Sequence, residues 1–179
     1  MIIRQEAMVD IETLSLEPNA MIVSLGAVLF SKEGVDDQNI FYETIDIVQA
    51  QKDHGDKFHI DAGTVTWWTS QSAASRAVFS TRKEKIEIVL SRFANWLKSW
   101  NVNGIWGNGS DYDNVVLAQA YRTCGLTLPW KFGKNRCYRT LKNLCPSIPL
   151  ERIGEHHNAL DDAKSQAAHA VQIMRKLGI

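Results

Sequence analysis

The pattern of apolar and polar positions in the first quarter of the chain is typical of β-strands. Runs rich in apolar and β-branched residues predict strands at residues 7–11, 21–30 and 40–45, with turn-like Glu-Gly and Asp-Asp pairs between them. Because consecutive strands with short connections usually pair with one another, we expect these three to form an antiparallel meander.

After about residue 60, helical spacing dominates the pattern. In residues 83–100, apolar side chains recur every three or four positions and predict an amphipathic helix packed on the sheet. Strands first, then alternating helices and strands, predict a mixed α/β sheet with helices on both faces. The other expected elements are a helix at 62–70, a strand at 104–106, a helix at 113–123, a fifth strand within 128–137, a short helix from residue 139 and a helix at 158–177.

The composition favours a single globular domain spanning residues 1–179. The chain is 45% hydrophobic, which is enough to bury a core, and no repeat or low-complexity linker interrupts it. Its 20 Lys and Arg balance its 20 Asp and Glu, so it lacks the strong positive field of proteins that coat duplex DNA. Any contact with nucleic acid must therefore be local.

Cysteine usage and hydropathy predict a protein of the cytoplasm. The three cysteines lack CxxC spacing, which argues against a disulfide framework and against a structural zinc site. The N-terminal segment has no apolar run of signal-peptide length, and no stretch approaches the ~20 apolar residues of a membrane span. We therefore expect reduced thiols, no membrane contact and a cytoplasmic location.

Asp10 and Glu12, in the sequence VDIET, are the first candidate metal ligands. The two-residue period of a strand places both carboxylates on one face, with Val9 and Ile11 on the other. Two like charges side by side cost free energy unless a cation neutralises them. On a solvated strand face, however, such a pair commonly serves only solubility.

The second candidate lies in a glycine-rich turn that leads from the strand at 104–106 into the next helix. Asp113 falls in the middle of the apolar face of that helix, while Asp111 falls on the opposite side. A carboxylate on a buried face needs a partner or a metal. The alternative role, a simple helix cap, fits Asp111 well and Asp113 poorly.

The third candidate precedes and begins the last helix, where two adjacent histidines are followed by two adjacent aspartates. The helical wheel puts neither Asp161 nor Asp162 on the core face, so it does not choose between them. Acids in a first turn also favour the helix dipole by ~0.3–1 kcal/mol without any metal. The expected core face consists of Leu160, Ala163, Ala167, Ala170, Val171, Met174 and Leu177.

In this order, the three segments resemble the motifs of the DnaQ-like DEDDh superfamily of 3′-to-5′ exonucleases. VDIET is similar to the first motif, YDNVVL to the second, and HNALDDA to the third, H-x-A-x-x-D-A. That last spacing selects His157 and Asp162 and leaves His156 and Asp161 as neighbours. The sequences MIVSLGAVLF, TVTWWTSQS and WGNG further resemble the phage and mycobacterial branch of small exonucleases (exonuclease A-like), so the resemblance covers nearly the whole chain.

The resemblance implies an RNase H-like fold, with a mixed five-stranded sheet flanked by helices, and catalysis with two Mg²⁺ or Mn²⁺ ions. His157 would accept a proton from the attacking water, and nucleoside 5′-monophosphates would leave the 3′ end of single-stranded or 3′-overhanging DNA or RNA. Two alternatives stay open: a module that binds 3′ ends without cleavage, and a hydrolase of very short oligonucleotides. The implied metal ligands are Asp10, Glu12, Asp113 and Asp162.

Several other side chains are candidates for contact with the substrate. Trp67 and Trp68 are adjacent, so one of them can stack on a base unless both pack in the core. Five basic residues between 131 and 142, with no acid among them, form a candidate phosphate patch, although a run of charge is usually a solvated face. Relatives of this size often pair, so we also expect a homodimer. The candidate substrate contacts are Thr13, Trp67, Trp68, Asn108, Tyr112, Arg136 and Arg139.

Overall fold

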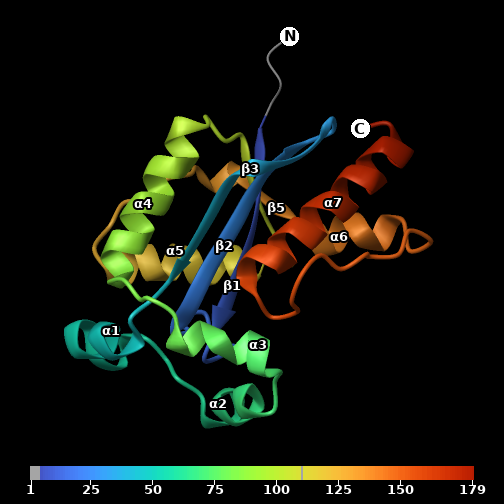
Figure 1. Cartoon of the computed structure of the whole chain (residues 1–179). Coiled ribbons are helices and arrows are strands. Elements are labelled where there is room, and N and C mark those ends of the chain that lie inside the picture. Colours follow the sequence, from blue (N-terminus) through green and yellow to red (C-terminus); the bar gives the residue numbers. More distant parts are fainter. Residues whose placement is uncertain (1–4, 110) are drawn as a thin grey trace.

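A five-stranded mixed sheet with helices on both faces forms the centre of the computed structural model (Figure 1), which describes residues 5–109 and 111–179. Residues 1–4 and Ser110 of the glycine-rich turn lie outside the described part. The strand order is β3-β2-β1-β4-β5, antiparallel in the first three strands and parallel from β1 to β5. The predicted meander and mixed sheet are therefore confirmed. The strands are β1 (Glu6–Thr13), β2 (Ile22–Ser31), β3 (Gly34–Thr44), β4 (Gly104–Gly107) and β5 (Asn135–Cys137).

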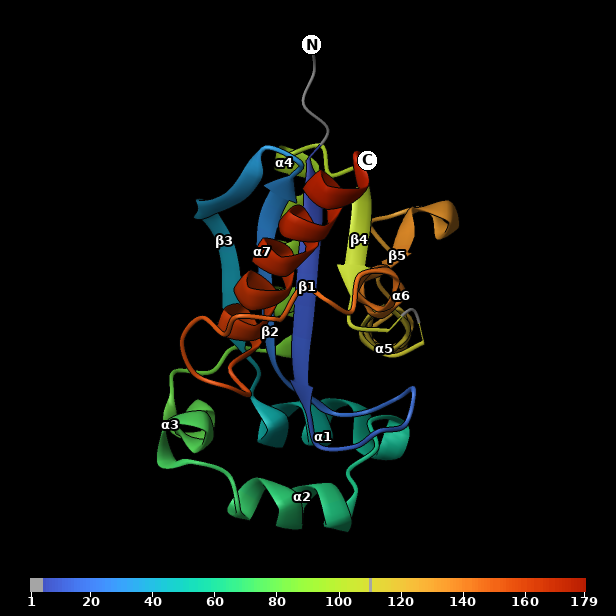
Figure 2. The same ribbon diagram turned by 90° about the vertical axis from the view of Figure 1, so that its right-hand side faces the viewer.

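The helices form a layer on each face of the sheet and a group at one of its ends (Figures 1 and 2). The long helix α7 crosses one face, with α6 beside it, while α4 and α5 lie on the other face. Helices α1, α2 and α3 gather at the end where β1 finishes. None of the described helices combines the length and apolar character needed to cross a bilayer. The helices are α1 (Ile47–His54), α2 (Ala62–Thr69), α3 (Ala73–Arg76), α4 (Ile86–Ser99), α5 (Asp113–Thr123), α6 (Tyr138–Leu144) and α7 (Ala159–Leu177).

Strand β1 separates two apolar clusters, one on each side of the sheet. Val9 and Ile11 pack in the larger cluster with residues of α4 and α5, whereas Met8 packs in the smaller cluster with residues of α7. The expected two-residue alternation is therefore present. Asp10 and Glu12 follow Met8 on the face covered by α7, and this register brings two carboxylates beneath the first turns of that helix.

Some elements differ from their expected extent. Helix α1 has only one buried residue, Ala50, so its sequence carries no periodic apolar signal that could have predicted it. Strand β3 is longer than the expected 40–45 because its first half is a polar edge strand in which no residue is fully buried. Trp100, expected on the buried face of α4, lies just beyond the helix and is 38% exposed.

Gly26 is the point at which β2 and the start of α7 come into contact. It pairs across the sheet with Asp10, and a Cβ atom added to it would lie 2.3 Å from the backbone carbon of Ala159 and the backbone nitrogen of Leu160. Only a glycine permits backbone to approach backbone so closely. Gly26 therefore sets how near the first turn of α7 can come to Asp10.

We expect Gly26→Ala to destabilise the protein by about 1–3 kcal/mol, since the added methyl group must push α7 away from the sheet. In a domain of this size each kcal/mol lowers Tm by about 2–4 °C, which thermal unfolding would detect. Gly133→Ala is the matched control, because a Cβ there meets nothing within 4 Å. Equal Tm values for the two variants would contradict the role given to Gly26.

Candidate functional site

Four carboxylates from three elements converge where the parallel strands β1 and β4 end. Asp10 and Glu12 come from β1, Asp113 is the first residue of α5, and Asp162 lies in the first turn of α7. Oxygen atoms of Asp10, Glu12 and Asp162 lie within 4.8 Å of one another. Asp113 lines the same pocket, which has a volume of about 270 Å³. Three segments far apart in sequence thus contribute to a single acidic pocket.

The start of α5 fixes Asp113 beside β1. One of its carboxylate oxygens accepts the backbone N–H of Asn108 at 2.9 Å, and the other accepts that of Ile11 at 3.4 Å. Its side chain is 3% exposed, as the helical wheel predicted. Gly107 makes room for it, because a Cβ there would lie 3.0 Å from the Cβ of Asp113. Asp111 is exposed, and the N-cap residue is Tyr112, which makes no side-chain cap.

The start of α7 gives its two aspartates different surroundings. Asn158 caps the helix by accepting the backbone N–H groups of Leu160 and Asp161 at 3.1 and 3.2 Å. Asp161 accepts the backbone N–H of Glu155 and so holds the preceding loop. Asp162 accepts the backbone N–H of His157 at 2.9 Å and is only 6% exposed. The sequence pattern alone did not distinguish these two aspartates as candidate metal ligands.

The buried face of α7 is wider at its start, and narrower at its end, than the expected core face. The expectation that Asp162 lies off the core face was wrong, because strands β1 and β2 both lie against the first turns of the helix. Leu177, expected in the core, is 41% exposed, since α7 diverges from the strands toward its C-terminal end (Figure 1). A wheel drawn from apolar residues alone omits buried polar positions.

Burial raises the pKa values of Asp10, Glu12 and Asp113, and repulsion by neighbouring acids adds to the increase for Asp10 and Glu12. Desolvation raises the pKa of Glu12 to about 8, and the charges of Asp162 and Asp113 add to it. The pKa of Asp10 is raised well above its usual value, first by burial and then by the neighbouring acids. For Asp113, burial raises the pKa to about 6, an increase limited by the amides of Asn108 and Ile11. The cluster therefore resists ionisation unless positive charge is supplied.

The donor atoms of this cluster suit a hard divalent cation. All four side chains offer carboxylate oxygen, the donor type that Mg²⁺ and Mn²⁺ prefer. Gln166 donates its amide N–H to Asp10 at 2.8 Å, which orients that carboxylate as an outer partner of a metal ligand does. A pocket of four carboxylates, two of them fixed by backbone amides, thus fits the divalent metal that the family resemblance implies.

Two imidazoles form the next part of the pocket wall. His156 and His157 stack with their ring centroids 3.7 Å apart, and both line the pocket. His157 has a backbone φ of 63°, in the left-handed region, and its ring meets Trp67 edge-on at 4.8 Å. Burial, followed by the neighbouring His156, lowers the pKa of His157. A lowered pKa keeps this imidazole neutral near pH 7 and able to accept a proton.

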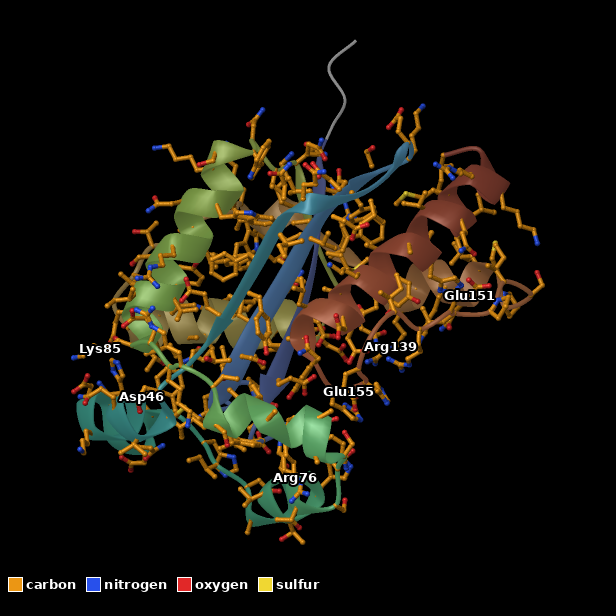
Figure 3. All side chains as sticks on the ribbon, viewed as in Figure 1. Asp46, Arg76, Lys85, Arg139, Glu151 and Glu155 are labelled. Atoms are coloured by element: carbon orange, nitrogen blue, oxygen red, sulfur yellow. The ribbon has the colours of Figure 1, made fainter. Side chains whose placement is uncertain are left out.

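The loop that carries the histidines is fastened to α3. The hydroxyl of Ser72 donates to the Glu155 carboxylate at 2.5 Å, and the hydroxyl of Ser75 donates to the His156 carbonyl at 2.8 Å. Figure 3 shows Glu155 on the side of the loop that faces α3. Ser75 is buried, so this contact belongs to the packed interior. The position of His157 therefore depends on a helix that the sequence pattern did not predict.

The two adjacent tryptophans point in different directions. Trp68 is 3% exposed, and its indole N–H donates to the Thr13 carbonyl at 2.9 Å, so it belongs to the core. Trp67 is 41% exposed and lines a second cavity of about 510 Å³, next to the acidic pocket, together with Glu12 and Tyr112. The hydroxyls of Tyr112 and Thr13 both donate to the Ser15 carbonyl at 2.8 Å and complete the turn after β1.

The basic segment 131–142 is divided between two surfaces. Arg139 donates to the Asn108 carbonyl at 2.5 Å and lines the acidic pocket with Lys142 and Asn108 itself. Arg136 instead donates to the carbonyls of Gly133 and Asn135, and it does not line the pocket. The structure thus brings one end of the expected phosphate patch to the site and leaves the other end away from it.

The sequence pattern did not reveal two polar residues of the pocket. Arg152 forms an ion pair with Asp162 from a loop that carries no periodic signal. Gln166 follows Asp162 by one helical turn, so the i, i+4 rule could have placed its side chain over the acids. Both lie within the pocket wall.

Comparison with known proteins identifies the family. The family model described as the 3′-5′ exoribonuclease Rv2179c-like domain matches residues 5–174. No curated protein matches the chain. The solved nuclease domain of 3′hExo, a DEDDh family member bound to rAMP, is similar at 15% identity and a TM-score of 0.67, over 97% of this chain and 93% of that one.

Two further solved structures have the same fold. One is a 3′-exonuclease described for 3′-end specific recognition of a histone mRNA stem-loop, with 14% identity, a TM-score of 0.65, and coverage of 98% of this chain and 84% of that one. The other is E. coli ExoI in a metal-free complex with single-stranded DNA, with 13% identity, a TM-score of 0.62, and coverage of 96% and 39%. The chain belongs to the 3′-5′ exoribonuclease Rv2179c-like domain family, and it shares its fold with the solved nuclease domain of a DEDDh family member.

Proposed function

We propose that this exonuclease removes nucleotides one at a time from the 3′ end of single-stranded RNA and releases nucleoside 5′-monophosphates. The observation that carries the proposal is the convergence of four carboxylates and an imidazole in a pocket of about 270 Å³. That volume is near the ~300 Å³ lower limit of small-ligand pockets, so it suits one terminal nucleotide. We propose RNA rather than DNA as the substrate because the family is described as an exoribonuclease.

Asp10, Glu12, Asp113 and Asp162 would hold two Mg²⁺ or Mn²⁺ ions in the proposed reaction. When bound, such ions make water more acidic and neutralise charge on the phosphate. His157, with its lowered pKa, accepts the proton of the attacking water.

Two cationic side chains complete the proposed reaction site. Arg139 lines the pocket and attracts the phosphate, and Arg152 neutralises Asp162 until a cation or the substrate replaces it.

The cavity beside Trp67 is the proposed position of the terminal base. It shares Ile11, Glu12 and Tyr112 with the acidic pocket, so the two cavities adjoin, and the base would lie in one and its phosphate in the other. The exposed indole offers a stacking surface that accepts any base. A single strand whose 3′ end lies in this cavity fits the predicted substrate. The homodimer stays a prediction.

Digestion of 5′-labelled RNA and DNA strands tests the proposed reaction. We expect Mg²⁺- or Mn²⁺-dependent shortening by single nucleotides, faster on RNA, with nucleoside 5′-monophosphates as products. His157→Ala should lower kcat by about 10²- to 10⁴-fold, because general base catalysis contributes that much. His156→Ala is the matched control for the base, and Asp161→Asn is the matched control for an Asp162→Asn variant that loses a metal ligand.

Three outcomes would count against the proposed reaction. Tight binding of 3′ ends without cleavage would favour a non-catalytic module, and cleavage limited to dinucleotides would favour an oligonucleotide hydrolase. Equal losses in the His156 and His157 variants would remove the assignment of the base.

The acidic cluster also predicts a pH dependence of stability in the metal-free protein. The pKa of Glu12 is about 8 when folded and about 4.3 when unfolded, so the folded protein binds the proton more tightly. Stability in EDTA should therefore fall as pH rises from about 5 to 8. Glu12→Gln should flatten this fall, and saturating Mg²⁺ should suppress it in the wild type. Identical Tm profiles for wild type and variant in EDTA would contradict the predicted repulsion.

Trp67→Ala tests the proposed base position. Loss of one stacked base costs about 1–3 kcal/mol, so KM for single-stranded RNA should rise by about 5- to 150-fold. Trp100→Ala is the matched control, since Trp100 has a similar exposed fraction, 38%, and lies beyond α4 away from the pocket. If both variants keep the wild-type KM, the indole does not hold the base.

A further inference from the structure

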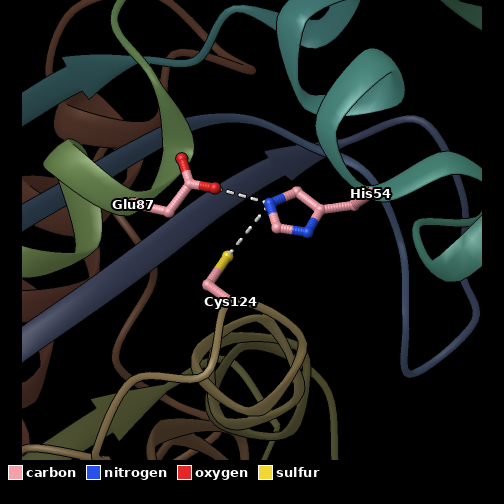
Figure 4. Close-up of side chains that lie close together, drawn as sticks. All are labelled: His54, Glu87 and Cys124. Carbon is pink, nitrogen blue, oxygen red and sulfur yellow. Dashed lines mark hydrogen bonds and ion pairs between the residues drawn. The ribbon is translucent and has the colours of Figure 1, made fainter.

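A second group of metal-binding side chains lies among α1, α4 and α5, outside the acidic pocket (Figure 4). His54 is the last residue of α1, Glu87 lies in the first turn of α4, and Cys124 directly follows α5. The Nε2 atom of His54 is 2.6 Å from a Glu87 carboxylate oxygen and 3.8 Å from the Cys124 sulfur. All three donor atoms lie within 4.8 Å of one another.

A single nitrogen atom of His54 faces both neighbours, so in the absence of a cation it bonds well to only one of them at a time. A protonated Nε2 donates its hydrogen to Glu87 and leaves the thiol with a weak contact, while an unprotonated Nε2 accepts from the thiol and repels the carboxylate. A cation at this point would be attracted by all three donors at once.

We propose that His54, Glu87 and Cys124 form a Zn²⁺ site that is separate from the catalytic pocket. One nitrogen, one sulfur and one oxygen are a donor set that zinc accepts and that Mg²⁺ does not favour. Zinc bonds of about 2.0–2.3 Å place tetrahedral ligands about 3.3–3.7 Å apart. The His54–Cys124 distance of 3.8 Å exceeds this range by only about 0.1 Å, and the Glu87 oxygen must move outward by less than about 1 Å.

Glu87 has the freedom that this movement requires. Its side chain is 33% exposed, whereas the His54 side chain is only 12% exposed, so the carboxylate rather than the ring would adjust. The same exposure gives an ion and a water molecule a way in, and water would supply the fourth ligand. None of the three residues lines the acidic pocket, so the two sites do not compete for donors.

A metal here would connect three helix ends and thereby brace the catalytic scaffold. Cys124 follows the last residue of α5, and Asp113 is the first residue of the same helix. The ion would therefore stabilise the fold without touching the substrate, because a metal that binds only the folded chain adds its binding free energy to stability. The spacing of cysteines could not reveal such a site, because its ligands are 33 and 37 residues apart in sequence and only one is a cysteine.

Cobalt substitution in the full-length protein tests the zinc site. Co²⁺ bound by a cysteine gives a thiolate charge-transfer band in the near ultraviolet, which the oxygen ligands of the catalytic pocket cannot produce. We expect this band at one equivalent in the wild type and in Cys137→Ser, and its loss in Cys124→Ser. Zn²⁺ should displace Co²⁺ and abolish the band.

Zinc affinity gives a second readout that does not depend on the spectrum. Zn²⁺ should bind the proposed site more tightly than the catalytic pocket. Cys124→Ser and Glu87→Gln should each weaken binding at the proposed site by about tenfold or more, and zinc should raise Tm less in both variants than in the wild type. Circular dichroism checks that the variants fold, and Glu87→Gln preserves shape if Cys124→Ser does not. If cobalt gives no thiolate band, or if zinc binds both variants as tightly as the wild type, the group is only an ion pair with a nearby thiol.

Discussion

Mutual repulsion among buried carboxylates is the constraint on which this structure depends. Two unit charges 4 Å apart interact by about 4 kcal/mol at an effective dielectric of 20, and a whole domain is stable by only about 5–15 kcal/mol. Asp10, Glu12 and Asp162 have oxygens within 4.8 Å of one another, with Asp113 in the same pocket. The fold tolerates this only because protons, Arg152 or a bound cation neutralise part of the charge.

The backbone reduces the repulsion but does not balance it. Asp113 and Asp162 each stand at the N-terminal end of a helix, where the dipole favours a carboxylate by about 0.3–1 kcal/mol. Backbone amides donate to both, and a charged hydrogen bond contributes about 1.5–3 kcal/mol. These gains orient the acids, yet burial still raises the pKa of Asp113 to about 6. The helix ends therefore position the carboxylates, while a cation is needed to neutralise their charge.

The sequence could predict the parts of the site that rest on local periodicity. The strand alternation placed Asp10 and Glu12 on one face, and the helical wheel placed Asp113 on a buried one. Asp162 was different, because its burial comes from the close approach that Gly26 allows and not from its own helix. Gly26 is 136 residues away from Asp162 in sequence, so a local pattern of residues around Asp162 cannot predict this contact.

The parts that could not be predicted are those that place the base and the substrate. His157 has a left-handed backbone conformation, and the carbonyl of its neighbour His156 accepts a hydrogen bond from Ser75 of α3. Helix α3 has only four residues, so it shows no apolar period. Trp67 and Trp68 are equivalent in sequence, and only packing against the core sends one inward and the other toward the pocket. Metal ligands can be placed on rigid strands and long helices, because their task is to hold charge at fixed points. His157 and Trp67, the proposed proton acceptor and base platform, instead lie where short elements meet, so tertiary contacts rather than periodicity decide their geometry.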